Sequence, residues 1–160
     1  MKCLVLIIAV AGMACLAACG PSQVSVTTQR YDNARSGQNL SETILKTVNV
    51  NPATFGMLFT RAVDDEIYAQ PLYVSSVRIP QLGIRNVVYV ATVNNTVFAF
   101  DADDPNANEP LWTANLTGSG ARSVEATDVG QNCGTYLDFT DKIGIVGTPV
   151  IDLRNETIWY

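Results

Sequence analysis

The sequence predicts an all-β protein built from four-stranded antiparallel sheets, and two observations lead to this prediction. Short runs rich in Val, Tyr, Phe, Leu and Thr alternate with Asn, Asp, Pro and Gly, which is strand composition with turn punctuation. No stretch after the N-terminal apolar segment has the period of an amphipathic helix, and 41–48 is expected to form one helical turn at most. With 160 residues, the chain is long enough for one domain with a core.

The expected strands lie at 55–63, 67–77, 86–93, 96–102 and 110–116. Between the third and fourth of these runs stands Asn94-Asn95, which predicts a two-residue hairpin because Asn tolerates the positive φ of such turns. The last four runs are therefore expected to form one antiparallel sheet in up-and-down order.

An acidic stretch at 101–109 follows the fourth run and raises the question of a calcium loop. A loop begun at Asp101 would place Asn106 at the sixth position, where glycine is needed, and Trp112 at the twelfth, where Glu is needed. We therefore expect a solvent-facing hairpin turn, in which Asp101 bonds to local backbone N–H groups and Pro105 fixes φ.

A Pro-strand pattern occurs twice in the chain. Gln70-Pro71-Leu72-Tyr73 corresponds to Thr148-Pro149-Val150-Ile151, and an aromatic-rich strand follows each copy. Two copies of a four-stranded unit predict a β-propeller of four-stranded antiparallel blades, with only about one and a half blades present at 55–160. The alternative is a coincidence between two short segments, because two copies are few for a repeat.

These residues resemble the blades of the pyrroloquinoline-quinone-dehydrogenase-like (quinoprotein-like) β-propellers. The resemblance is carried by AQPLYV (69–74), NVVYVAT (86–92), NTVFAFDAD (95–103) followed by PLW (110–112), GTPVID (147–152) and YDNARSG (31–37). It implies that Ala99, Asp101 and Trp112 lock neighbouring blades together. It also implies that 55–63 is the outer strand of the last blade. The sequence departs from the family where the usual Thr-Gly of the turn is replaced by DDPNANE.

A propeller closes its ring with about four to eight blades, and this closure removes exposed strand edges. One and a half blades cannot close a ring. We therefore expect this chain to be the N-terminal fragment of a longer protein.

The N-terminus has the layout of an export signal, with Lys2, an apolar run at 4–13 and small residues before a cysteine. Leu16-Ala17-Ala18-Cys19 is similar to the bacterial lipobox, which predicts cleavage before Cys19 and a lipid on its thiol. Gly20 at the next position favours the outer membrane, by resemblance to sorted lipoproteins. We expect a signal peptide at 1–18, and a lipidated tether with an irregular lead-in segment at 19–54. The alternative is a plain secretory signal with an incidental cysteine.

Charge and side-chain chemistry restrict the possible partners. Cleavage before Cys19 leaves nine basic and fifteen acidic residues, a net charge of −6. An acidic chain without a basic stripe argues against nucleic acid as a partner. The sequence has no histidine, which removes the usual general base and most zinc sites from this chain.

The best functional candidate is the long connection 117–146, because a connection of this length in a compact fold is usually functional. Its candidate site residues are Glu125, Asp128, Cys133, Asp138 and Asp141. An unpaired Cys133 is uncommon in an oxidising compartment, so we expect it to be buried and inert or paired outside this chain. The alternative is a solvated excursion whose acids face water. The spacing of these acids and of Cys133 does not correspond to a metal site.

Three functions remain open. The first is a membrane-anchored exported lipoprotein whose propeller binds a protein or polymer. The second is a quinone-dependent dehydrogenase of alcohols or sugars, which would need pyrroloquinoline quinone, calcium and catalytic residues that we cannot assign here. The third is a truncated, non-functional product. The fold alone does not decide between binding and catalysis.

Overall fold

The structure is a computed structural model that describes residues 24–129, 138–139 and 141–160. It confirms the all-β prediction, since strands dominate and the described helix is a single turn. The strands of the main sheet are β1 (Leu72–Ile79), β2 (Gly83–Ala91), β3 (Thr96–Asp101) and β4 (Trp112–Asn115). The remaining elements are β5 (Val124–Glu125), α1 (Ala126–Val129), β6 (Lys142–Ile143), β7 (Val150–Asp152) and β8 (Thr157–Trp159).

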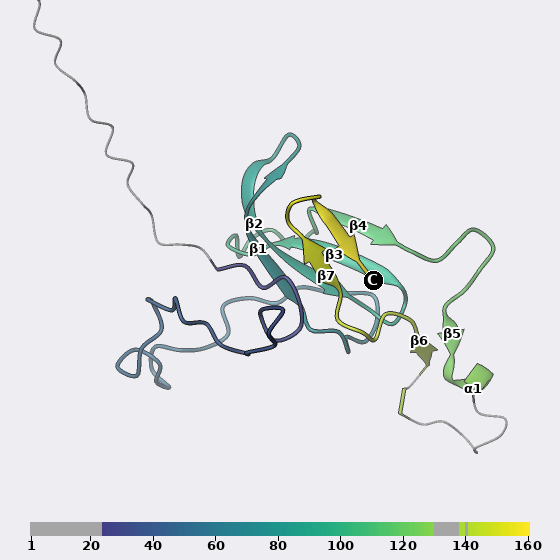
Figure 1. Cartoon of the computed structure of the whole chain (residues 1–160), viewed down its shortest axis with the longest axis horizontal. Coiled ribbons are helices and arrows are strands. Elements are labelled where there is room, and N and C mark those ends of the chain that lie inside the picture. Colours follow the sequence, from purple (N-terminus) through teal and green to yellow (C-terminus); the bar gives the residue numbers. More distant parts are fainter. Residues whose placement is uncertain (1–23, 130–137, 140) are drawn as a thin grey trace, which may run out of the picture.

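The four-stranded sheet has the predicted up-and-down order, β1-β2-β3-β4, and every neighbouring pair is antiparallel (Figure 1). Tyr89, Ala99 and Trp112 lie side by side across β2, β3 and β4. Residues 96–99 pair with 112–115, so antiparallel strands flank the acidic turn as the hairpin prediction requires, although β4 begins at Trp112 and not at 110.

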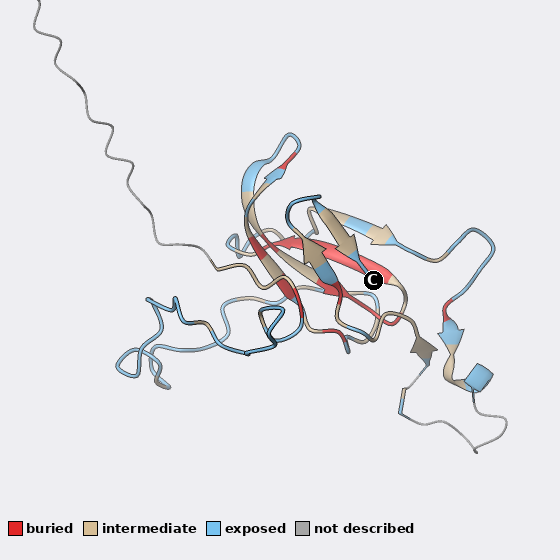
Figure 2. Ribbon diagram, viewed as in Figure 1, coloured by how far each residue is buried: buried red, intermediate tan, exposed pale blue. Residues whose placement is uncertain are grey.

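The core lies along β3, whose six residues are all buried (Figure 2). On one face Phe98 and Phe100 stack with ring centroids 5.7 Å apart, and Val90 completes the cluster. On the other face Val97 and Ala99 belong to two further apolar clusters. A central strand that is covered on both faces reads as a continuous apolar run, which explains the sequence TVFAF.

The turn between β2 and β3 differs from the prediction. It is a three-residue loop at 93–95, because Ala91 pairs with Val97 and the N–H of Thr92 bonds to the oxygen of Thr96 at 2.9 Å. Of the two asparagines only Asn95 has a positive φ, +59°. This is the pattern of a type I turn followed by a left-handed residue.

The expected strand at 55–63 is wrong, since the structure has no strand there. The end of this segment crosses a face of the sheet. Val63 packs on the Phe98 cluster, and the Arg61 guanidinium donates a hydrogen bond to the backbone oxygen of Asp104. Phe55 and Leu58 are exposed. Without a pairing partner for its backbone groups, an apolar run does not become a strand.

The N-terminal lead-in segment is more ordered than expected. Val26 and Tyr73 exchange two backbone hydrogen bonds of 2.7 and 3.0 Å, and the oxygen of Thr27 accepts 2.8 Å from the N–H of Ile151. Residues 26–27 therefore connect β1 to β7, and Thr28 beside them is buried. The alternation in the sequence VSVT was too short to predict this pairing.

The two Pro-strand copies lie next to each other, because the N–H of Gln70 donates to Oγ1 of Thr148 at 3.0 Å. As expected, the second copy starts a new antiparallel pair, β7 with β8. Figure 1 shows this hairpin in front of the four-stranded sheet.

Candidate functional site

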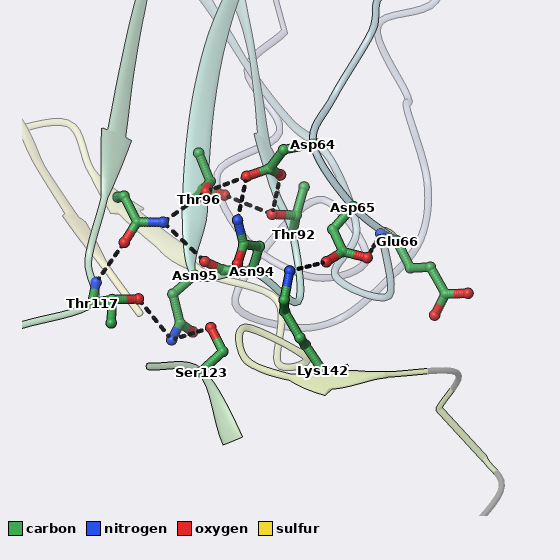
Figure 3. A network of polar contacts seen from close by, with 11 residues as sticks. Asp64, Asp65, Glu66, Thr92, Asn94, Asn95, Thr96, Thr117, Ser123 and Lys142 are labelled. Atoms are coloured by element: carbon green, nitrogen blue, oxygen red, sulfur yellow. Dashed lines mark hydrogen bonds and ion pairs between the residues drawn. The ribbon is translucent and has the colours of Figure 1, made fainter. Parts of the chain in front are cut away.

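A polar network gathers at the tip of the β2–β3 hairpin, and Asp64 is its centre (Figure 3). The carboxylate of Asp64 accepts hydrogen bonds from Oγ1 of Thr92 at 2.8 Å, Nδ2 of Asn94 at 2.8 Å and Oγ1 of Thr96 at 2.5 Å. Both threonines are at least 95% buried. A buried hydroxyl without a partner is costly, so Asp64 stabilises this turn.

Two opposing effects act on the pKa of Asp64. Partial burial raises it, while the hydrogen bonds from Thr96, Asn94 and Thr92 lower it. Together the hydrogen bonds prevail, and the pKa of this carboxyl lies below its ordinary value. Asp64 therefore acts as a hydrogen-bond acceptor for three side chains of the hairpin.

The network continues from the hairpin to the start of the 117–146 connection. Nδ2 of Asn115 donates to Oγ1 of Thr96 at 2.9 Å and to the oxygen of Asn94 at 3.0 Å. Nδ2 of Asn95 donates to Oγ of the buried Ser123 at 3.1 Å. The chain is thus held to the β2–β3 tip on both sides of the start of the connection, at Asn115 and at Ser123.

The other end of the connection is held at the same tip. Nζ of Lys142 lies 3.0 Å from Oδ2 of Asp65, and this hydrogen bond raises the pKa of the lysine. Two residues further on, Gly144 lies so close to the turn that a Cβ there would come within 3.0 Å of the carbonyl of Val93. We call the segment 117–146 the braced excursion, because both of its ends bind the hairpin tip.

The braced excursion has secondary structure of its own in the part that the structure describes. Its described part contains the short pair β5–β6 and the turn α1, and Figure 1 shows these elements to one side of the sheet. The N–H of Ala126 donates to the backbone oxygen of Asp141 at 2.7 Å, which extends the β5–β6 pairing by one residue. Strands of two residues are too short for a periodic pattern in the sequence to reveal them.

The predicted site residues are only partly brought together. Glu125 and Asp128 share Arg122, with shortest N–O distances of 3.5 and 2.7 Å. The hydrogen bond from Arg122, followed by one from the N–H of Glu125, lowers the pKa of Asp128 to about 2. These two acids are therefore occupied by a local ion pair at the surface.

The other predicted acids point to different places. Asp138 is exposed and accepts a hydrogen bond of 3.2 Å from the Tyr68 hydroxyl through its backbone oxygen. Asp141 is exposed beside β6. Cys133 and Cys19 lie outside the described residues. Within the part of the chain that the structure describes, no group of three or more His, Cys, Asp or Glu residues is arranged to hold a metal ion.

The motif residues Ala99, Asp101 and Trp112 occupy the main sheet. Oδ1 of Asp101 accepts the N–H groups of Asp103 at 2.9 Å and Asp104 at 3.1 Å, so it holds the acidic turn as expected. Ala99 is fully buried opposite Trp112. The Trp112 ring lies 5.8 Å from that of Tyr89 and faces the β7–β8 hairpin.

Sequence reasoning missed the centre of the network. Asp64, Asp65 and Glu66 form an acidic run a few residues before β1, which is a visible pattern. Their partners are distant in sequence, however, since Thr96 follows Asp64 by 32 residues and Lys142 follows Asp65 by 77. Only the folded hairpin brings these groups together.

Comparisons of the chain with protein-family models, curated proteins and solved structures found no match. The quinoprotein-like resemblance therefore stays a prediction. Among the described residues, no helix is long and apolar enough to cross a membrane.

Proposed function

We propose that this chain is a membrane-anchored exported lipoprotein whose β-propeller part binds a protein or polymer partner. The Leu16-to-Cys19 pattern supports the anchor. The four-stranded sheet and the contact between Gln70 and Thr148 support the start of a repeated blade architecture.

The braced excursion is the observation that carries the binding proposal. Its base is fixed through Lys142 with Asp65 of the segment before β1 and through Ser123 with Asn95 of the β2–β3 turn. Val129 at the end of α1 is 54% exposed, so this apolar side chain is accessible to a partner. A loop held on a rigid scaffold is the usual way in which proteins present binding residues.

A photo-crosslinking amino acid at Val129, in cells that make the protein, tests the binding role. We expect one discrete crosslinked product, and we expect excess protein without the crosslinker to compete it away. Lys142→Gln should lower its yield severalfold, since the base of the excursion is then less firmly held. The matched control places the crosslinker at Leu40, which is 90% exposed and does not belong to the excursion. Equal products from both positions would contradict the proposal.

The dehydrogenase alternative is tested on the same protein with pyrroloquinoline quinone and calcium added. Sustained dye reduction with alcohols or sugars would replace the binding proposal by an enzymatic function. We expect no turnover above that of free quinone.

The anchor is tested by growth with radiolabelled palmitate. We expect label in the wild-type chain and none in Cys19→Ser, because the thioether-linked lipid requires the thiol of residue 19. The matched control is Cys133→Ser, which should keep the label. Equal labelling of wild type and Cys19→Ser would refute the anchor and leave the binding role to be judged by the crosslinking result.

A further inference from the structure

The segment 40–50, which we call the apolar loop, presents large apolar side chains to the outside. Each of its residues is exposed (Figure 2), and the side chains of Ile44 and Val48 are 76% and 79% exposed. Its apolar members are Leu40, Ile44, Leu45, Val48 and Val50. Phe55 and Leu58 are not part of it, because the quinoprotein-like resemblance assigns their run to a blade. Apolar side chains gathered on an exposed segment are typical of a surface that meets a membrane or a protein.

The backbone of the apolar loop is bonded by the side chains of the loop itself. Oε1 of Glu42 accepts the N–H groups of Ile44 at 2.7 Å and Leu45 at 2.9 Å. Asn49 accepts the N–H of Lys46 through Oδ1 at 2.7 Å and donates Nδ2 to the oxygen of Ile44 at 2.7 Å. These bonds join residues at most five positions apart, so they do not depend on a distant segment of the chain. A backbone that bonds itself is suited to contact with lipid, because lipid offers no hydrogen-bond partners.

The charges indicate which kind of lipid contact this loop makes. Glu42 and Lys46 are its only charged residues, so the apolar loop is neutral. The stem of a lysine lies along an apolar surface while its ammonium group stays at the headgroups. The chain as a whole is acidic, so attraction to anionic lipid does not hold it at a membrane. The contact therefore depends on the apolar side chains.

The proposed lipid on Cys19 would bring the apolar loop close to a bilayer. Cys19 and Val24 are five residues apart, a stretch that spans at most about 18 Å. Val26 is bonded to Tyr73, which ties the sheet to the same short tether. In Figure 1 the described chain starts to the left of the sheet, and the blue loops of the lead-in segment lie on that side, whereas the braced excursion lies to the right. A short tether gives such a surface a high effective concentration at the bilayer.

We propose that the apolar loop docks on the bilayer that holds the Cys19 lipid, with Ile44 and Val48 in the interfacial layer of that membrane. A second membrane contact beside a lipid makes anchoring firmer. It also orients the sheet, so that the braced excursion points away from the bilayer and toward its partner. This inference rests on the anchor of the proposed function, and its test therefore has an arm that does not need the Cys19 lipid.

The test measures the contact of position 48 with lipid in the whole chain, reconstituted into vesicles of phosphatidylcholine. An environment-sensitive fluorescent amino acid replaces Val48, and a nitroxide-labelled lipid is the quencher. The matched control carries the same amino acid in place of Val129, on the braced excursion. We expect quenching several times stronger at position 48 than at position 129. Equal quenching at the two positions would overturn the proposal.

A second arm separates the loop from the anchor. Cys19→Ser with a polyhistidine tag directly after residue 19 is held on vesicles that contain a nickel-chelating lipid. We expect the same strong quenching at position 48. Strong quenching in this arm, with no palmitate on the wild-type chain, would refute the anchor and support the docking of the loop. Weak quenching in this arm would refute the docking even if palmitate labels the wild type.

A protein variant tests whether the side chains of the loop make the contact. Ile44→Asp should lower the quenching at position 48 severalfold, because a carboxylate is costly to bring into an apolar layer. Ile84→Asp makes the same change at an exposed residue of β2 and should leave the quenching unchanged. Equal quenching in the two variants would contradict the contact. A photo-crosslinker at position 48 that joins two copies of the chain, and not lipid, would place a second copy on the loop and overturn the proposal.

Discussion

Gly144→Ala is expected to lower the free energy of unfolding by about 3 kcal/mol, the upper end of what overpacking costs. The added Cβ would lie within 3.0 Å of the carbonyl carbon and oxygen of Val93 and of Oδ1 of Asn95. Val93 is buried in the turn and cannot move away without disturbing the β2–β3 hairpin. The change should therefore separate the braced excursion from the hairpin tip. Urea unfolding followed by tryptophan fluorescence measures the loss.

Gly147→Ala is the matched control for this prediction. It lies three residues further along the same segment, its φ is not positive, and a Cβ there meets nothing within 4 Å. We expect it to change the unfolding midpoint very little or to raise it slightly, because Ala restricts the unfolded chain more than Gly does. If both variants unfolded at the wild-type midpoint, the close contact at Gly144 would be wrong.

The four-stranded sheet was predictable because the amino-acid composition of each segment indicates a strand. The run Val97 to Phe100 is apolar on both faces, and its neighbours at 86–91 and 112–115 are bounded by turn residues. A sheet with short connections depends on interactions between adjacent segments, which a single sequence displays directly. The order of the strands followed from this alone.

The register of the hairpin and the fate of 55–63 were not predictable in the same way. Asn94-Asn95 suits a two-residue turn, but the pairing of Thr92 with Thr96 takes Val93 into the loop, and Val93 is buried there. The run 55–63 has strand composition, yet its backbone finds no strand beside it among the described residues. Tertiary contacts decide both outcomes, and propensity does not include them.

The candidate site shows the same division between local and distant interactions. Asp101 was predicted to hold its own turn, and it does so over two and three residues. Glu125 and Asp128 were predicted as a site, but Arg122 lies close enough in sequence to take both of them. Asp64 and Asp65 act through partners that lie 28 to 77 residues away, so no local pattern could assign their roles.

Asp101→Ala is expected to lower the free energy of unfolding by about 2 kcal/mol, because it removes one acceptor from two backbone N–H groups at once. Asp101 also lies 3.2 Å from Nε of Arg85, but that arginine is 42% exposed, so the ion pair contributes about 1 kcal/mol at most. The comparison of Asp101→Asn with Arg85→Gln separates the two effects. Asn keeps an acceptor oxygen for the turn, so both variants should lose only the small ion-pair contribution in urea unfolding. An equal loss for Asp101→Ala and Asp101→Asn would show that charge, and not the hydrogen-bonded turn, is what Asp101 supplies to the sheet.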